Sequence, residues 1–311
     1  MISNSSRTPE VLAVGGGKGG VGKSVIAANL AVAVSRRDLR VVLIDGDLGG
    51  ANLHTLLGIL EPRRSLSDFF SRRVSSLEEV RIATSEPNLE LISGAQAHLE
   101  MANPAYAQKE KLLRHIRALE ADLVVIDIGA GSSFNTLDLF LAAQQSMLVV
   151  VPDPTSIENA YHFLKAAFFR LLKQAEPKER VRGVIATVTD DLSRSGIRSP
   201  RDLIIRAGEE DAEVGLILTR QAGAFHPGVV VNRVRLPDHR RLGEDICLAC
   251  REYFGVEVRD LGCIDEDPLV GQSVVRRRPV LALTPGSPFA RSLESLADLL
   301  VDRTQGGRRV G

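Results

Sequence analysis

Residues 17–24 read Gly17-Lys18-Gly19-Gly20-Val21-Gly22-Lys23-Ser24, just after the apolar run at 11–14, and they decide the fold. The pattern G-x-x-x-x-G-K-[ST] is typical of a phosphate-binding loop, whose glycines let backbone N–H groups approach phosphate oxygens. We expect Lys23 to neutralise the terminal phosphates and Ser24 to ligate Mg²⁺. The helix that would begin near Val25 adds its positive N-terminal dipole end. The stretch therefore predicts a nucleotide site, although an ordinary loop of this kind has no use for the second lysine, Lys18.

The motif requires a strand before it and a helix after it, and the surrounding pattern supplies both. Residues 25–34 form a helix-prone run without glycine or proline. Short, β-branched, continuously apolar runs recur along the chain, as is typical of strands buried on both faces of a parallel sheet. These runs lie at 11–14, 41–44, 89–92, 123–126, 147–151, 181–188, 229–231 and 258–264. The alternation predicts an α/β fold with a doubly wound, mostly parallel sheet flanked by helices.

The alternation has no linker, so we expect one nucleotide-binding domain over residues 10–303. Within it, residues 190–227 are predicted to be a surface insertion with two short helices. Residues 1–9 and 304–311 are predicted to be a disordered extension and a disordered tail. One helix start is expected at Thr155 and Glu158, which have capping-box spacing.

Composition limits the classes of partner. The 311 residues contain 39 Lys and Arg and 39 Asp and Glu, so the net charge is zero and gives no general attraction to nucleic acid or anionic lipid. No apolar run reaches the ~18 residues of a membrane-spanning helix. The three cysteines fit a reducing compartment better than a disulfide framework. We therefore expect a cytoplasmic protein that reaches a membrane only through a partner.

Acidic residues follow two of the predicted strands. Asp45 and Asp47 end the strand at 41–44, and Asp127 ends the strand at 123–126. Because ligands bind outside the carboxyl ends of strands in such sheets, all three carboxylates should face the phosphates. We expect Ser24 to ligate Mg²⁺ directly and Asp45 and Asp127 to bind it through water. Asp47 is then free to orient and polarise the attacking water.

These motifs together resemble the MinD/ParA family of deviant-Walker ATPases. The resemblance rests on K-G-G-x-G-K-[ST] with Lys18, on D-x-D-x-x-x-x-N from Asp45 to Asn52, and on the Asp127 strand. The segments at 45–58, 127–131 and 153–161 are most similar to the FlhG-like flagellar-number regulators within that family. The similarity covers residues 10–303, interrupted by 190–227.

The resemblance implies roles for individual residues. In this family two subunits face each other across two ATP molecules, and the extra lysine, here Lys18, reaches the partner's site. Asn52 would help to position the transition state, so the implied catalytic set is Lys18, Lys23, Asp47 and Asn52. Residues on the adenine side would be Asn232, Arg233, Asp265 and Glu266, although the family usually has proline where Asp265 stands. The full set expected to bind nucleotide is Gly17, Lys18, Gly19, Gly20, Val21, Gly22, Lys23, Ser24, Val25, Asn232, Arg233, Asp265 and Glu266.

The resemblance also implies an ATP-dependent homodimer whose hydrolysis depends on dimerisation. Such a protein is a slow ATP hydrolase and a switch between an ATP dimer and an ADP monomer. It would regulate the position or number of a flagellum, a division site or a cargo through a protein partner, which the sequence does not identify.

Members of the family often end in a basic amphipathic helix that binds membrane, and this chain differs. Its last predicted helix, at 288–303, places apolar residues on one face and Glu294, Asp298 and Asp302 on another. Because anionic lipid repels an acidic face, we expect this helix to pack in the core and not to bind membrane.

Three alternatives remain open. Cys247 and Cys250 form a C-x-x-C that some relatives use for an iron–sulfur cluster, although here the pair falls on an apolar helical stripe. Arg276-Arg277-Arg278, with Arg233 and Arg235, is a candidate patch for ParA-like DNA binding, which the neutral net charge disfavours. A metabolic P-loop ligase or kinase resembling dethiobiotin synthetase lacks a recognisable substrate motif here.

Overall fold

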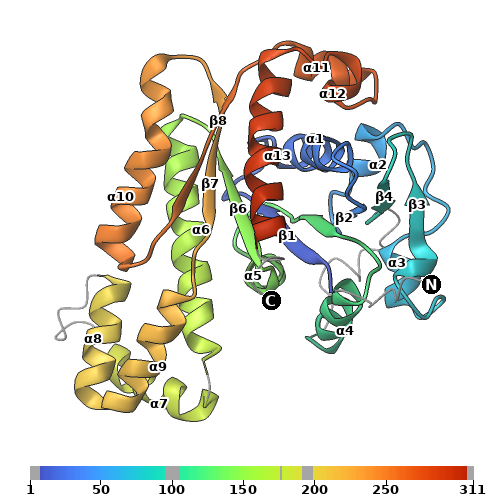
Figure 1. Cartoon of the computed structure of the whole chain (residues 1–311). Helices are drawn as coiled ribbons and strands as arrows, with labels where there is room; N and C mark the ends of the chain where they lie inside the picture. The colour runs from blue at the N-terminus through green and yellow to red at the C-terminus, as the bar shows by residue number, and fades with distance from the viewer. Residues whose placement is uncertain (1–7, 95–105, 176, 191–198, 307–311) are drawn as a thin grey trace.

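The computed structural model describes residues 8–94, 106–175, 177–190 and 199–306 and is built on an eight-stranded sheet (Figure 1). The strand order is β3-β4-β2-β5-β1-β6-β7-β8, and every pairing is parallel except that of β3 with β4. The strands are β1 (Glu10–Gly15), β2 (Val41–Asp45), β3 (Arg81–Ala83), β4 (Leu89–Ile92), β5 (Leu123–Asp127), β6 (Gln145–Val150), β7 (Gly228–Val234) and β8 (Arg259–Asp265). The predicted fold class is thus confirmed.

The helices of the described residues lie on both faces of this sheet. Their bounds are α1 (Lys23–Ser35), α2 (Leu53–Leu56), α3 (Leu66–Phe70), α4 (Tyr106–Arg117), α5 (Phe134–Ala142), α6 (Pro154–Lys173), α7 (Lys178–Asp190), α8 (Pro200–Glu210), α9 (Ala212–Gly223), α10 (Leu242–Phe254), α11 (Leu269–Val275), α12 (Val280–Leu283) and α13 (Pro288–Gly306).

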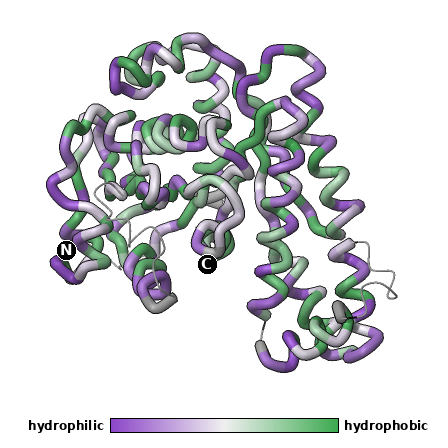
Figure 2. Tube along the Cα trace, turned by 180° about the vertical axis from the view of Figure 1, so that it is seen from behind, coloured by the Kyte–Doolittle hydropathy of each residue, from purple (hydrophilic) through white to green (hydrophobic). Residues whose placement is uncertain are grey.

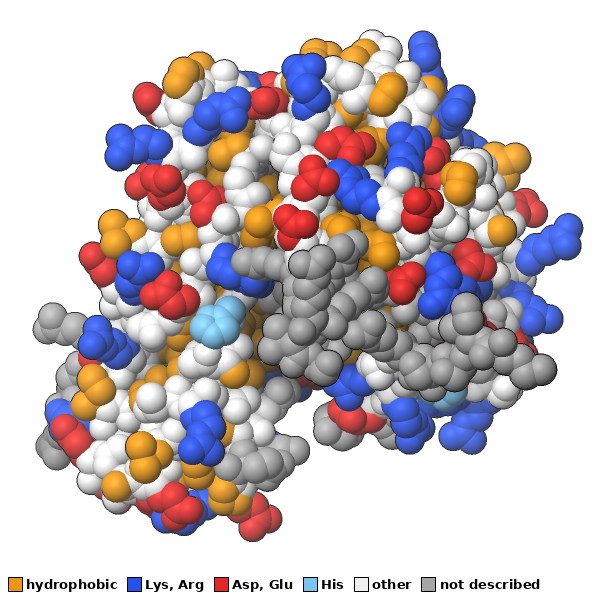
Figure 3. Space-filling view, viewed as in Figure 1, with side chains coloured by type: hydrophobic (Ala, Val, Ile, Leu, Met, Phe, Trp, Pro, Cys, Tyr) orange, Lys and Arg blue, Asp and Glu red, His pale blue; other side chains and the backbone are white. Residues whose placement is uncertain are grey.

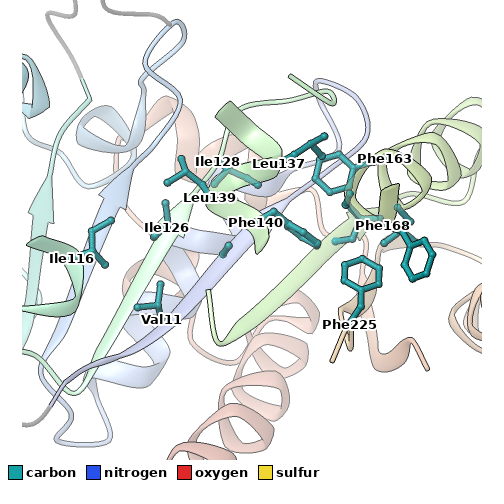
Figure 4. Close-up of a cluster of buried hydrophobic side chains, with 14 of the residues drawn as sticks. Val11, Ile116, Ile126, Ile128, Leu137, Leu139, Phe140, Phe163, Phe168 and Phe225 are labelled. Carbon is teal, nitrogen blue, oxygen red and sulfur yellow. The ribbon is translucent and has the colours of Figure 1, made fainter. Parts of the chain in front are cut away.

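Along the central strands, successive side chains point to opposite faces of the sheet and pack into two separate hydrophobic cores. In β1, Val11 and Ala13 join one cluster, whereas Leu12 and Val14 join the other. The first cluster lies against α3–α10, and Figure 4 shows part of it, where Phe140 and Phe163 meet edge to face at 4.9 Å. The second lies against α1, α2, α12 and α13. Figure 2 shows hydrophobic colour along the inner strands and hydrophilic colour on outer turns.

The acidic last helix packs as predicted. Phe289, Leu293 and Leu300 of α13 are buried, and α13 lies along α1. Arg37, just after α1, pairs with Glu294 at 2.8 Å and with Asp298 at 2.6 Å, which uses two carboxylates of the acidic face. No helix in the described part of the chain combines the length and the apolar character that crossing a bilayer requires.

One predicted strand is wrong. Residues 181–188 belong to helix α7, because the apolar positions 181, 184, 185 and 188 follow the helical spacing i, i+3, i+4, i+7. Val181 and Ile185 are buried on that stripe. The edge strand β3, which has only three residues, was not predicted from the sequence.

Helices α7, α8 and α9 form a group at the end of α6 and the lower left of Figure 1. The group contains the two helices predicted for the insertion, but it starts with α7, before the predicted boundary at 190. Residues 191–198 of the predicted insertion, 1–7 of the extension and 307–311 of the tail lie outside the described residues. Helix α13 continues to Gly306, beyond the predicted start of the tail. The domain division itself stays a prediction.

Candidate functional site

The glycine-rich loop connects the end of β1 at Gly15 to the start of α1 at Lys23. Gly20 and Gly22 have φ of 80° and 97°, a left-handed conformation that favours glycine. Gly17 lies so close to α6 that an added Cβ would be 2.2 Å from the Asn159 carbonyl oxygen. These positions therefore require glycine for backbone reasons, and the loop can present its N–H groups to an anion.

Strand β7 supports this loop from behind. The Asn232 side-chain amide donates to the Val21 carbonyl at 2.8 Å, and the Arg233 guanidinium donates to the Gly20 carbonyl at 3.0 Å. Asn232 is buried, and it would collide with a side chain at Gly22. Both residues are thus placed at the loop, and their predicted contact with adenine stays a prediction.

Asp45 and Asp127 are neighbours at the carboxyl ends of β2 and β5, where they lie in register. Both are buried, with exposed fractions of 0% and 1%. Asp45 Oδ2 accepts hydrogen bonds from the backbone N–H groups of Asn52 at 2.9 Å and Leu53 at 3.0 Å. The Ser24 hydroxyl hydrogen-bonds to Asp127. The structure thus brings Ser24, Asp45 and Asp127 together as predicted.

Unpartnered oxygens at this point fit a hydrated divalent cation. Asp45 Oδ1 and Asp127 Oδ1 are buried without a hydrogen-bond partner among the described residues. Mg²⁺ prefers oxygen ligands and keeps several waters, so a serine hydroxyl and two carboxylates suffice as the protein's share. Among the described residues, no group of three or more His, Cys, Asp or Glu side chains is arranged to hold a metal ion by itself.

Burial perturbs the charged groups of this site. Burial raises the pKa of Asp127 to about 7 and the pKa of Asp45 to about 6. Burial also lowers the pKa of Lys23, against the opposing effect of nearby Asp127 and Asp47. Keeping these groups charged therefore lowers the stability of the nucleotide-free protein, and such perturbed pKa values are common at functional sites.

Removing one of these charges gives a testable stability prediction. Because the folded pKa of Asp127 is raised, its contribution to stability is fully present below about pH 4 and is lost as the pH rises through about 7. Asp127→Asn should therefore stabilise the nucleotide-free protein at pH 8, by about 2–4 kcal/mol. Thermal melts in EDTA at pH 8 and pH 5 measure this, and the gain should shrink at the lower pH. A variant no more stable than the parent chain at pH 8 would contradict the prediction.

Asp47 lies beside the loop that follows β5. Its Oδ1 accepts the Gly50 N–H at 3.0 Å, and a Cβ on Gly129 would lie 3.4 Å from its carboxylate carbon. A cavity of about 340 Å³ opens here, lined in part by Asp47, Gly129 and Ser133. The carboxylate thus faces a space that can hold water. Asn52 is exposed and caps α2 through its backbone only.

Lys18 contacts the start of α6. Its Nζ lies 2.7 Å from Thr155 Oγ1 and 3.2 Å from Asp153 Oδ1. Hydrogen bonds from the Thr155 hydroxyl and the Ser156 backbone N–H lower the pKa of Asp153. Neither partner of Lys18 was predicted from the sequence, and the helix start predicted at Thr155 is wrong. Asp153 caps α6, since it accepts the Ser156 N–H at 2.7 Å, and the Asp-Pro pair at 153–154 was the signal.

The residues predicted for the adenine side are paired with arginines. Asp265, at the end of β8, forms an ion pair with Arg240, and Glu266 forms one with Arg235. A cavity of about 180 Å³ lies at the carboxyl ends of β7 and β8 and includes Arg235, Arg240 and Asp265 in its lining. A contact of Asp265 or Glu266 with adenine stays a prediction.

The cysteine pair lies in the core side of α10. Cys250 is buried and Cys247 packs against the same cluster. Burial raises the pKa of Cys250 to about 12 and that of Cys247 to about 11. Cluster ligands are thiolates, so this environment favours packing over iron–sulfur binding.

Comparison with known proteins adds a family and relatives. The chain matches the family model CbiA, described as the CobQ/CobB/MinD/ParA nucleotide binding domain, over residues 12–280. It is 32% identical to the flagellum site-determining protein YlxH of Helicobacter pylori, over 95% of this chain and 83% of YlxH. It is 35% identical to the antiactivator FleN of Pseudomonas aeruginosa over 158 residues, which cover 50% of this chain and about half (55%) of FleN.

A solved structure shares the fold. The septum site-determining protein MinD of Pyrococcus horikoshii, complexed with Mg-ADP, superposes with a TM-score of 0.63 and 21% identity. The superposition covers 96% of this chain and 98% of the other, and at this identity it shows the fold alone.

Proposed function

This chain belongs to the CobQ/CobB/MinD/ParA nucleotide-binding family, and on that basis we propose a Mg²⁺-dependent ATPase switch of the MinD/FlhG type. It dimerises on binding ATP, hydrolyses ATP slowly to ADP and phosphate, and acts through a protein partner. The observation that carries the proposal is the pair of buried, unpartnered carboxylate oxygens on Asp45 and Asp127 beside Ser24, directly behind a glycine-rich phosphate loop.

The residues of the site divide the work of phosphoryl transfer. Backbone N–H groups of residues 17–25 and the N-terminus of α1 hold the phosphates. Lys23 neutralises charge that develops on the transferred group, and Asp47 orients the attacking water in the adjoining cavity. When bound, Mg²⁺ supplies further charge stabilisation, with Ser24, Asp45 and Asp127 on its protein side.

Lys18 is the residue that would make hydrolysis depend on a dimer. Its ammonium is one-third exposed and lies on the Asp153 and Thr155 side chains at the surface of the single chain. An exposed ion pair of this kind is worth little, so leaving it costs little. A second subunit's site can then receive Lys18 as a cation supplied in trans.

The same site is linked to a surface that can report the nucleotide state. Asp45 holds the N–H groups that begin α2, so a ligand that recruits this carboxylate acts directly on that helix. A partner that recognises the changed surface would carry the output. Similarity to YlxH over most of both chains supports flagellar placement or number as the process, with a division site or cargo as alternatives.

The trapped dimer is the experiment that tests this function. Asp47→Ala should retain ATP binding and lower turnover by about 10²–10⁴-fold, because no carboxylate orients the water. The variant should therefore accumulate as a dimer of twice 33.7 kDa with Mg-ATP and remain monomeric with Mg-ADP. Light scattering after size exclusion measures the mass. A variant that stays monomeric with saturating ATP would sink the switch mechanism.

A ParA-like DNA-binding ATPase is the alternative that an observation favours. Arg276, Arg277 and Arg278 are exposed after α11, and no carboxylate among the described residues pairs with them. On the face in Figure 3, however, basic and acidic side chains are interspersed, without a broad basic surface. DNA retention by the ATP form that falls steeply with salt would support this alternative.

A further inference from the structure

A large cavity among the described residues lies away from the phosphate loop. It has a volume of about 970 Å³ and is formed where α4, α5, α6 and α7 meet; we call it the α4–α7 hollow. Sites for small ligands are concave and typically span about 300–1,000 Å³, so the hollow has the size of one.

Positive charge dominates its lining. The cations come from α4, α6 and α7, and they outnumber the two acids, Glu110 and Asp138. They are Lys109, Arg117, Arg170, Lys173 and Arg182. The neutral net charge of the whole chain therefore conceals one strongly basic concave surface.

Two of these cations share a single carboxylate. Lys109 Nζ lies 2.6 Å from Asp138 Oδ2, and Arg170 Nε lies 2.6 Å from Asp138 Oδ1. Gln174 also donates to Asp138, at 3.1 Å. Lys109 is only 8% exposed, so this network forms the buried end of the hollow.

The other three cations line the same hollow. The structure gives no ion pair for Arg117, Lys173 or Arg182 among the described residues. An anion that enters the hollow would give these three cations a counter-charge, and the exposed guanidinium fork of Arg182 matches phosphate oxygens.

The lining also contains apolar surface between the cations. Leu113, Leu141 and Ile185 contribute it, from α4, α5 and α7. A ligand that combines anionic groups with a flat or apolar moiety would use both parts of the hollow.

We propose that the α4–α7 hollow is a second ligand site, which binds a small organic phosphate separately from the nucleotide at the phosphate loop. The phosphate groups lie among Arg170, Lys173 and Arg182, and the organic moiety lies against Leu113, Leu141 and Ile185. Binding at this site does not depend on ATP hydrolysis, so the binding test does not depend on the function proposed above.

The test uses the full chain with the phosphate loop saturated by Mg-ADP. Isothermal titration with inorganic pyrophosphate, at low ionic strength, should show one further binding event. Titration with adenosine 3′,5′-bisphosphate should show tighter binding, because that probe also carries a base. The double variant Lys173→Glu/Arg182→Glu should weaken both by more than about tenfold. Both positions are exposed, so the variant should fold.

A matched control distinguishes binding in the hollow from nonspecific electrostatic attraction of the probes to the protein. Arg276→Glu/Arg278→Glu changes the net charge by the same amount at exposed positions outside the hollow, and it should leave both affinities unchanged. Equal weakening by the two double variants would overturn the proposal, as would the absence of binding for both probes at millimolar concentration. Retention of a polyglutamate peptide with no binding of either probe would assign the hollow to an acidic protein partner and overturn it as well.

Discussion

Replacing Lys23 by alanine is expected to weaken Mg-ATP binding by about 10²–10⁴-fold, because the loss of one partner of a buried charge pair costs about 3–5 kcal/mol. Lys23 is 8% exposed and lies near Asp127 and Asp47. Without its ammonium, the incoming phosphates would meet two carboxylates and lose their nearest cation. The variant should therefore bind nucleotide only at concentrations far above those that saturate the parent chain.

Titration calorimetry with ATP and with ADP measures this effect, and a thermal melt without nucleotide checks that the variant folds. Lys18→Ala serves as the matched control, since it removes an ammonium from the same loop at a partly exposed position. If Lys23→Ala kept its affinity within about threefold of the parent chain, Lys23 would not be the phosphate lysine.

Lys18→Ala is expected to abolish turnover while leaving ATP binding nearly intact. A cation supplied in trans to phosphoryl transfer is worth about 10³–10⁵ in rate. In the single chain, Lys18 contacts only Asp153 and Thr155 among the hydrogen-bonding partners that the described residues provide, so its removal leaves the loop supported. Phosphate release at saturating ATP measures turnover, and calorimetry measures binding in the same sample.

A Lys18→Ala variant that hydrolysed ATP at the parent rate would contradict the role in trans. One that failed to bind ATP would place Lys18 in its own subunit's phosphate site. Asp153→Asn offers a second check, because it loosens the contact that holds Lys18 in the monomer and should leave the ammonium in place for catalysis.

The sequence predicts the nucleotide side of this protein well because the chemistry there is local. Glycines at 20 and 22 are needed for left-handed backbone, and Asp45 and Asp127 end strands whose residues are buried. Strand ends, loop and helix start are fixed by neighbours in the chain. Ser24, Asp45 and Asp127 therefore lie in one cluster, and their binding of Mg²⁺ stays a prediction.

What the sequence did not predict depends on contacts between distant segments. Asp153 holds Lys18 across a separation of 135 residues, and no local pattern joins the two. Asn232 supports the loop at Val21 in the same way. The strand predicted at 181–188 is wrong for another reason. Its β-branched composition is typical of a strand, whereas the spacing of its apolar residues is typical of a helix, and the segment is part of helix α7.

The α4–α7 hollow illustrates the same limit. Lys109, Asp138 and Arg170 come from three helices, and each alone reads as an ordinary charged surface position. Only packing brings their charges together and leaves Lys109 buried. The net charge of the chain, which is zero, therefore does not predict this local cluster of cations.

The central claim is that hydrolysis needs two subunits, with Lys18 of one acting on the ATP held by the other. Lys18→Ala and Asp47→Ala, each inactive alone, are mixed in equal amounts before Mg-ATP is added, and phosphate release is followed. In a mixed dimer, the subunit with intact Asp47 receives intact Lys18 from its partner. With free subunit exchange, the account predicts recovery of about a quarter of the parent activity. A mixture as inactive as its two components, although light scattering shows that mixed dimers form, would contradict it.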